Sequence, residues 1–476
     1  MGNFKIFSKY TALLIAGIIG GCYSYDPVPP IIDGDTYTGI TTKEQKKLPA
    51  DYEVLSLEMA EEVAIANNPD YISKQHAMAA AWSRYYQAIG AYFPTVTGGY
   101  NLGETSNNPA YQSMVQSNNT SDINQQIAVT GQWTIFNGLI REMNLLIAKH
   151  NAKSSEYIEE DTRRLLIKAI ATQYNNVLLA VEKNRIATTD MEFQQKLLAE
   201  TQLKYEAGAV PLSDVLNFKV KVNVAEGNQL SAQYEYNTSK YALAALMGLT
   251  EGTVPDTIKF PSMKMNMGEK LLDIGIYLDT ALSNRPDLKS YREILAAAEY
   301  NVYAKWGAFS PTVAVNGGLN YTSDHVKVHS RYGNRTYGES DYTSHSYNRI
   351  YNYGTSVSWL LFDGNIRYEQ VREAQALVAQ NQYQLENKWI SVVQDVRAAY
   401  DNYVQNTKKA VLYQKTLAVV TKQRDLVEEE YKAGNIELTR LNEAQTALVQ
   451  ADTDFVTALI NVQNAKAQLE AATSSR

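Results

Sequence analysis

The two halves of this sequence share four short motifs in the same order, and this internal repeat constrains the fold more than any other feature. Two motifs recur at an offset of 217 residues: Asn68-Pro69-Asp70 as Arg285-Pro286-Asp287, and Pro94-Thr95-Val96 as Pro311-Thr312-Val313. Two more recur at an offset of 226 residues: Trp133–Arg141 as Trp359–Arg367, and Tyr205–Gly208 as Tyr431–Gly434. The chain is therefore two copies of one structural unit, and the second copy carries an insertion between Pro311 and Trp359.

Each half contains a window of 69 residues without Gly or Pro, at 139–207 and 365–433. Apolar and tyrosine side chains recur there at helical spacing. These are Leu166, Ile170, Tyr174, Val177 and Val181, with Val392, Val396, Tyr400, Tyr403 and Thr407 as counterparts. A helix of this length spans about 100 Å, which is typical of a coiled coil or an α-barrel stave. Gly208 and Gly434 are predicted to end the two helices.

A second helix is expected after each long one, at 212–247 and 438–472, and one shorter helix before each of Pro94 and Pro311. Alternating polar and apolar residues predict strands between the helices. The strands are expected at 94–103, 123–136, 309–321 and 349–362, joined by turns at 105–121 and 323–348. Four strands cannot close a barrel, because about eight is the practical minimum. A barrel with an open lumen therefore needs several chains, and three chains of four strands give twelve.

The N-terminus reads as an export signal. Lys5 and Lys9 precede the short apolar stretch 12–19, which is too short to span a bilayer. The stretch ends at Gly20-Gly21-Cys22, which resembles the bacterial lipoprotein box, and Cys22 is the only cysteine of the chain. Lipidation of Cys22 after cleavage is therefore expected, and the alternative is a chance cysteine in an ordinary signal. No later segment predicts a membrane-spanning helix, so any crossing must be made by β-strands.

Together these motifs resemble the TolC family of outer-membrane efflux channels, especially its lipoprotein members, over about residues 55–472. The resemblance implies a mainly α fold with a β-barrel part. It also implies a homotrimer, with a twelve-stranded barrel in the outer membrane that continues as a twelve-helix periplasmic α-barrel. Outer-membrane lipid, a periplasmic adaptor (membrane fusion) protein and an inner-membrane pump of the RND or ABC type are the implied partners. Such a channel conducts passively, and the pump supplies the energy.

The resulting domain prediction follows the repeats. It places a signal peptide at 1–21 and a lipid-anchored extended segment at 22–55. Repeat 1 covers 56–249, with its hairpin at 94–136 and its tip at 204–212. A linker at 250–270 joins the equatorial belt, and repeat 2 covers 271–476, with its hairpin at 309–362 and its tip at 430–438.

The resemblance also suggests roles for residues at the two helix tips. Adaptor docking is implied for Tyr205, Gly208, Tyr431 and Gly434, although each glycine can equally be only a helix cap. The founding member of the family carries two acidic residues, three positions apart, on one face of an inner helix. Aligned through Gly434, these positions are Arg440 and Glu443 in this chain, and Asp214 is the first-repeat equivalent of Arg440. An Asp214–Arg440 latch that closes the tip is one hypothesis, and ordinary solvated tip charges are the other.

Little in the sequence indicates chemistry. The net charge is -7 and no long Lys/Arg run exists, so nucleic acid is not an expected partner. No catalytic or phosphate-binding motif occurs, so neither an enzyme nor a cofactor is expected. The cluster of His325, His329 and His345, predicted to lie in the second hairpin loop, suggests either a metal site or a solvated loop, and no metal is predicted.

Two functions of different classes remain open. One is the exit channel of an efflux or secretion system, located in the bacterial outer membrane and extending into the periplasm. The alternative is a structural, non-conducting coiled-coil lipoprotein that spans the periplasm. The strand pair in each repeat favours the channel, because a structural rod has no use for amphipathic strands. The cargo (drugs, metal ions or proteins) and the class of pump are left undetermined.

Overall fold

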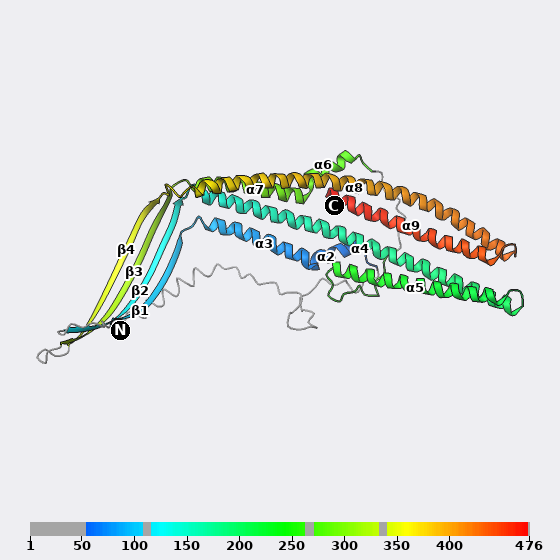
Figure 1. Cartoon of the computed structure of the whole chain (residues 1–476), viewed down its shortest axis with the longest axis horizontal. Helices are drawn as coiled ribbons and strands as arrows, with labels where there is room; N and C mark the ends of the chain where they lie inside the picture. Colours follow the sequence, from blue (N-terminus) through cyan, green and yellow to red (C-terminus); the bar gives the residue numbers. More distant parts are fainter. Residues whose placement is uncertain (1–53, 108–115, 262–270, 333–339, 475–476) are drawn as a thin grey trace.

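The computed structural model describes residues 54–107, 116–261, 271–332 and 340–474, and the chain is a long rod with a β-sheet at one end (Figure 1). One element order occurs twice: two short helices, two strands, a long helix and a returning helix. The first set is α2 (Leu57–Asn67), α3 (Pro69–Gly90), β1 (Thr95–Asn107), β2 (Gln116–Phe136), α4 (Ile140–Glu206) and α5 (Leu212–Leu246). The second set is α6 (Ile274–Asn284), α7 (Pro286–Gly307), β3 (Thr312–Tyr332), β4 (Ser340–Ser358), α8 (Ile366–Lys432) and α9 (Leu438–Thr473).

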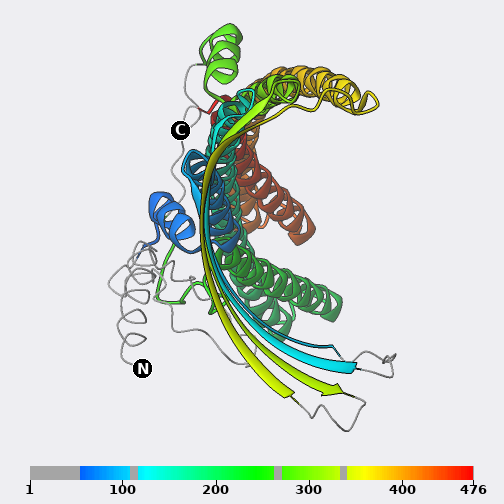
Figure 2. The ribbon, with the colours of Figure 1, turned by 90° about the vertical axis from the view of Figure 1, so that its left-hand side faces the viewer.

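The long helices α4 and α8 each contain 67 residues and coincide with the two windows that lack Gly and Pro. Toward the sheet, α4 packs against α3 and α7, and α7 in turn packs against α8. Toward the far end, α4 packs against α5 and α9, and α9 packs against α8. Along the rod the helices therefore form one curved layer, with α4 in its interior and α8 at one edge (Figure 2).

Each predicted short helix is in fact a pair of helices, so the expectation of one helix before each of Pro94 and Pro311 is wrong. The breaks lie at Asn68 and Arg285, and a proline follows at the first position of α3 and α7. Proline tolerates that position because the missing N–H would have no partner in the helix. At the first break, the Asn68 Oδ1 atom accepts a hydrogen bond from the Tyr71 N–H at 3.1 Å and caps α3.

The four strands form one antiparallel sheet in the order β1-β2-β3-β4. The strands are longer than predicted. In the first hairpin β1 ends at Asn107 and β2 begins at Gln116, and in the second hairpin β3 ends at Tyr332 and β4 begins at Ser340. The prediction of turns across 105–121 and 323–348 is therefore wrong for the described residues of both stretches, while 108–115 and 333–339 lie outside the described residues. Residues 105–107, 116–121, 323–332 and 340–348 of these stretches continue the ladder, and a ladder of main-chain hydrogen bonds does not require apolar side chains.

The apolar core lies where the short helices meet the long ones. In the first repeat, Ile170, Tyr174 and Val177 of α4 are buried with Leu55, and the Tyr174 hydroxyl donates to the Leu55 carbonyl at 2.8 Å. In the second repeat, the cluster includes Val392, Val396 and Tyr403 of α8, packed against α9. Most of the positions predicted from helical spacing are therefore core positions. Of the predicted linker 250–270, Val254 and Ile258 join the first cluster, and 262–270 lie outside the described residues.

Candidate functional site

The two tips, meaning the turns that join α4 to α5 and α8 to α9, have the same backbone structure. At the first tip, the Gly208 N–H bonds to the Tyr205 carbonyl at 2.8 Å and the Ala209 N–H bonds to the Lys204 carbonyl at 2.8 Å. The second tip repeats this pattern through Gly434. These are Schellman motifs, with φ of +76° at Gly208 and +75° at Gly434. The two glycines therefore cap their helices, whatever else they do.

The two tyrosines at the tips are not equivalent. Tyr431 accepts a hydrogen bond from the Lys204 ammonium group at 3.0 Å, and the same ammonium nitrogen lies 4.6 Å from the centroid of its ring. Tyr205, its counterpart in the first repeat, has an exposed fraction of 41%. Lys204 and Tyr431 therefore join the two tips of one chain, while Tyr205 faces solvent.

A small apolar cluster lies directly behind the tips and joins all four helices that form them. Its buried members are Leu197 of α4, Phe218 of α5 and Leu441 of α9, and Tyr431 of α8 packs against them. A pocket of about 680 Å³ opens between the tips, and Lys204, Asp214, Tyr431 and Glu437 are among its lining residues. The tips thus form one unit with a polar hollow between them.

The three predicted gate residues lie at the tips, but the structure does not bring them together as a latch within one chain. Arg440 pairs with Glu443 one turn along α9 at 3.5 Å, and the two side chains are 69% and 72% exposed. Asp214 accepts a hydrogen bond from the adjacent Ser213 hydroxyl at 3.4 Å. An exposed pair of this kind contributes under about 1 kcal/mol. Any Asp214–Arg440 contact would therefore have to form between chains or in another state of the tip.

The motifs Asn68-Pro69 and Arg285-Pro286 lie at helix junctions whose contacts the sequence did not disclose. At these two points, which together we call the equator, the end of α5 meets the start of α3 and the end of α9 meets the start of α7. In the first repeat, Asn68 Nδ2 donates to the Leu246 carbonyl of α5 at 2.9 Å. In the second, Arg285 takes the place of Asn68 and donates to the Ala472 carbonyl of α9 at 3.5 Å. Both side chains supply donors to the unpaired carbonyls at a helix C-terminus.

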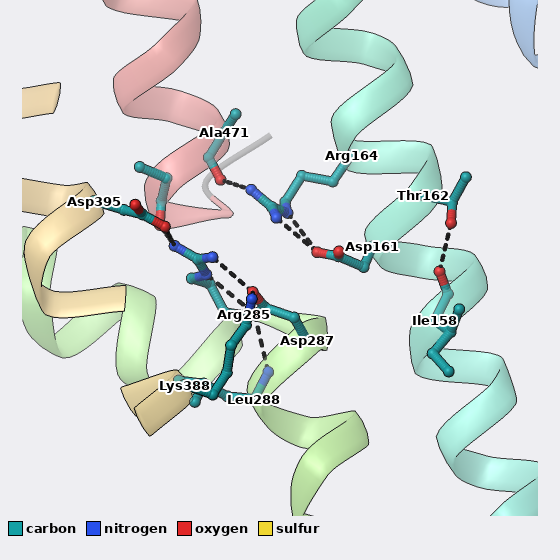
Figure 3. Close-up of polar contacts among 11 residues, drawn as sticks. Ile158, Asp161, Thr162, Arg164, Arg285, Asp287, Leu288, Lys388, Asp395 and Ala471 are labelled. Carbon is teal, nitrogen blue, oxygen red and sulfur yellow. Dashed lines mark hydrogen bonds and ion pairs between the residues drawn. The ribbon is translucent and has the colours of Figure 1, made fainter. Parts of the chain in front are cut away.

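Arg285 is also the centre of an ionic network in which Arg285 and Asp287 are the buried members (Figure 3). It holds Asp287 in a bidentate pair at 3.1 and 2.6 Å and reaches Asp395 of α8 at 3.3 Å. Lys388 adds a second ion pair to Asp287 at 2.9 Å. Arg164 of α4 donates to the Ala471 carbonyl beside this network and pairs with Asp161 at 2.6 Å. The network therefore fastens α4, α7 and α8 to the end of α9.

The charge state of Asp287 follows from these contacts. Burial alone would raise the pKa of this carboxyl group, since the side chain is only 7% exposed. The hydrogen bonds and charges of Arg285 and Lys388 outweigh burial and lower the pKa to about 2. Asp287 is therefore ionised at every physiological pH.

The repeated motif at 133–141 and 359–367 forms the corner between sheet and helix. Two successive residues with positive φ, Gly138 and Leu139, turn the chain from β2 into α4, and Gly364 and Asn365 do the same before α8. The arginine that ends each motif fixes the corner. Arg141 donates to the Thr134 carbonyl at 2.8 Å, and the equivalent Arg367 donates to the Ala308 carbonyl at 3.1 Å.

The sheet has two chemically distinct faces, because successive side chains of a strand point to opposite sides. One face, here called the polar face, carries Thr97, Asn101, Asn124, Gln126, Thr130, Asn320, Thr322, Asp324, Asn348 and Asn352. The opposite, apolar face carries Val96, Tyr100, Leu102, Ile127, Val129, Leu319, Tyr321, Tyr347, Tyr351 and Tyr353.

The polar face is cross-linked by side-chain hydrogen bonds. Gln126 donates to Asn320 across the β2–β3 pair at 3.1 Å, and Asp324 accepts from Asn124 and Ser346 on its two neighbouring strands. The apolar face instead exposes large side chains, for example Tyr353 at 93%. A sheet of this kind suits a boundary between an aqueous space and an apolar surround.

The remaining predicted site residues have different outcomes. Cys22 lies outside the described residues. His325 lies on β3 and His345 on β4, so the prediction that they lie in a hairpin loop is wrong. The side chain of His329 is not among those that the structure describes. In the described part of the chain, no three His, Cys, Asp or Glu side chains are arranged to hold a metal ion.

Within the described ranges, no helix is both long enough and apolar enough to cross a membrane.

Solved structures with the same arrangement of sheet and helices exist. The outer-membrane channel OprN superimposes with a TM-score of 0.71, at 17% identity, over 88% of this chain and 90% of that one. A crystal structure of CusC superimposes with a TM-score of 0.72, at 15% identity, over 89% of this chain and 93% of that one. The chain therefore has the same fold as these outer-membrane channels.

Sequence comparison identifies the family. Residues 62–249 and 277–475 match the family described as Outer membrane efflux protein, and the chain belongs to that family. The chain is also 22% identical over 456 residues to outer membrane protein TolC of Escherichia coli (strain K12), an alignment that covers 92% of this chain and 85% of that protein. The resemblance inferred from the motifs is confirmed.

Proposed function

We propose that three copies of this chain assemble into the passive exit channel of a tripartite efflux or secretion system. In this assembly twelve strands close a barrel in the outer membrane and twelve helices continue it into the periplasm. A periplasmic adaptor and an inner-membrane pump of the RND or ABC type deliver the cargo, and the pump supplies the energy. Lipidated Cys22 and outer-membrane lipid anchor the sheet end of the rod.

The observation that carries this proposal is the open, two-faced sheet. Among the residues that the structure describes, no strand lies beside the outer edges of β1 and β4, and a long unpaired edge pairs readily with another strand. Three copies, joined β4 to β1, would satisfy every edge and give twelve strands, enough for a barrel with an open lumen. The polar face would line that lumen and the apolar face would contact lipid.

The helices support the same assembly. Exposed apolar residues follow one face of α5 at intervals of four, at Leu212, Leu216, Val220 and Val224. On α8, at the other edge of the curved layer, Leu412, Val419 and Leu426 recur every seven residues and are 52–67% exposed. A heptad stripe is typical of a helix that packs against a partner. Contact between α8 of one chain and α5 of the next would cover both faces.

Heat-modifiable migration on gels and single-channel current in planar bilayers test the proposal together. We expect a heat-labile trimer that conducts once its tips are opened. Val419→Asp should abolish the trimer, because it places a charge in the chain-to-chain contact, while Val419→Leu should preserve it. A folded trimer that passes no current under any gate-opening substitution would favour the structural, non-conducting lipoprotein instead.

A further inference from the structure

The histidine cluster singled out in the sequence is not explained by the channel. The chain has 5 histidines, and three of them lie between residues 325 and 345. Two of these, His325 on β3 and His345 on β4, are direct partners in the strand register. Their ring centroids are 4.2 Å apart, and the ring planes are inclined at 59°. The pair lies on the apolar face, in the half of the hairpin remote from the helices.

We propose that His325 and His345 together bind a divalent transition-metal ion of the Zn²⁺, Ni²⁺ or Cu²⁺ class on the outward side of the sheet. An imidazole nitrogen binds such an ion at about 2.0–2.1 Å, which places the ring centroid roughly 3 Å from the ion. Two rings on one ion, at ligand angles of about 90–110°, have centroids about 4.5–5.2 Å apart. The observed separation therefore requires only a small outward rotation of one ring.

The strands make this pair a good chelator. Directly opposite residues of an antiparallel pair are held at a fixed spacing by the ladder on both sides, so little conformational entropy is lost when the ion binds. β3 and β4 contain 21 and 19 residues, about twice the 9–11 that cross a bilayer, so in the proposed barrel the half remote from the helices extends beyond the lipid. His325 is half-buried and His345 is exposed there, which leaves the ion open to water ligands. Imidazole is a preferred ligand of these metals, whereas Mg²⁺ requires oxygen ligands.

The charges around the pair affect its affinity for a cation. The charged residues described on the same face are Lys327 on β3, Asp341 and Arg349 on β4, and Glu104 on β1, and Glu104 lies in the same cross-strand row as the two histidines. The titratable tyrosines described on this face are Tyr100, Tyr321, Tyr347, Tyr351 and Tyr353. Lys327 and Arg349 lower the affinity for a cation, and Asp341 and Glu104 raise it. Only a deprotonated ring nitrogen binds a metal ion, so acidification releases it.

Calorimetric titration of the full, untagged protein in detergent tests the site, with the chlorides of Zn²⁺, Ni²⁺, Cu²⁺ and Mg²⁺ as probes. We expect one transition-metal ion per chain, Cu²⁺ bound more tightly than Ni²⁺, no binding of Mg²⁺, and weaker binding in acid. His325→Gln and His345→Gln should each weaken binding by about tenfold or more. His76→Gln, a control on α3, should not.

Spectroscopy separates this pair from other ligands. The electron paramagnetic resonance spectrum of bound Cu²⁺ should show two equivalent nitrogen ligands in the parent protein and one in either variant. Unchanged heat-modifiable migration of both variants would show that they fold. The proposal is overturned if folded His325→Gln or His345→Gln binds as the parent does, if His329→Gln alone abolishes binding, or if Mg²⁺ binds equally well.

Discussion

Lys204 of the first repeat and Tyr431 of the second connect the two helix tips of the chain, with the lysine nitrogen 3.0 Å from the tyrosine oxygen and 4.6 Å from the ring centroid. If channel opening separates the two tips, this contact must break. The contact combines a hydrogen bond with a cation–π interaction, so its strength is about 0.5–1 kcal/mol at an exposed position.

Removing this contact should therefore favour the open tip. Lys204→Met and Tyr431→Ala should each raise closed-state conductance in planar bilayers, and the double variant should add little beyond either one. Tyr431→Phe should have an intermediate effect, because it keeps the ring and loses the hydroxyl. Tyr205→Phe is the matched control at the exposed position of the other tip. Strictly additive effects of the two substitutions would show that the residues act independently.

The tip glycines allow docking to be separated from capping. Gly434 has a φ of +75° and no atom within 4 Å of an added Cβ, and Gly252, far from the tips, has a φ of +69° with equal space. A side chain at either position costs about 1–2 kcal/mol of backbone strain. Gly434→Trp should therefore retain the trimer and lose cross-linking to the adaptor, while Gly252→Trp should retain both. Loss of cross-linking in both variants would assign the effect to strain alone.

The proposed latch between Asp214 and Arg440 gives a separate prediction, because it requires a contact that the single chain does not make. Asp214→Ala combined with Arg440→Ala should raise bilayer conductance and sensitise cells to large antibiotics, since three equivalent links would be lost from a symmetric trimer. Glu443→Ala breaks only the pair within α9 at 3.5 Å and should leave conductance low. Equal conductance of the parent and the double variant would argue against the latch.

Lipidation of Cys22 is tested by metabolic labelling. Cys22→Ala should abolish incorporation of a radioactive fatty acid, because the lipobox cysteine is the residue that carries the lipid in a bacterial lipoprotein. The trimer and some export should persist, since the strands of the barrel would still hold the protein in the membrane. Labelling of the variant at the level of the parent would contradict the assignment.

The ionic network at the equator should make the assembly sensitive to acid. The pKa of Asp287 is about 2 in the folded chain and is ordinarily 3.8. A lowered pKa means that the unfolded chain binds the proton more tightly than the folded chain does. Ionised Asp287 therefore stabilises the folded chain in full above about pH 4, and this stabilisation is lost as the pH falls toward 2. The difference corresponds to about 2 kcal/mol per chain.

Urea unfolding at several pH values measures this contribution. At neutral pH, Asp287→Asn should be less stable than the parent protein by at least that amount, because Arg285 remains buried with a weaker partner. The difference between the two proteins should narrow as the pH approaches 2. Asp70→Asn, at the equivalent exposed position of the first repeat, should have little effect at any pH. A constant difference at all pH values would contradict the assigned pKa.

Local signals in the sequence were sufficient for the helical part of the fold. The absence of Gly and Pro between Leu139 and Ala207 predicted a helix that the structure shows at Ile140–Glu206. Helical spacing identified Ile170, Tyr174 and Val177 as core residues, and they are buried. Glycine at 208 and 434 located both tips, because only a left-handed residue completes a Schellman motif. Each of these features depends on residues close together in the chain.

Other features depended on contacts between distant parts of the chain. The strands extend into polar segments because their ladder partners continue there, which no alternation of side chains reveals. His325 and His345 are twenty positions apart and meet only because the β3–β4 register makes them partners. Lys204 pairs with Tyr431, and Arg285 with Asp395, across different helices. The sequence by itself determined the repeats, the long helices and the tip turns, because local backbone preference sets them. Tertiary packing decided which charges and rings form pairs, because only packing brings residues distant in the chain together.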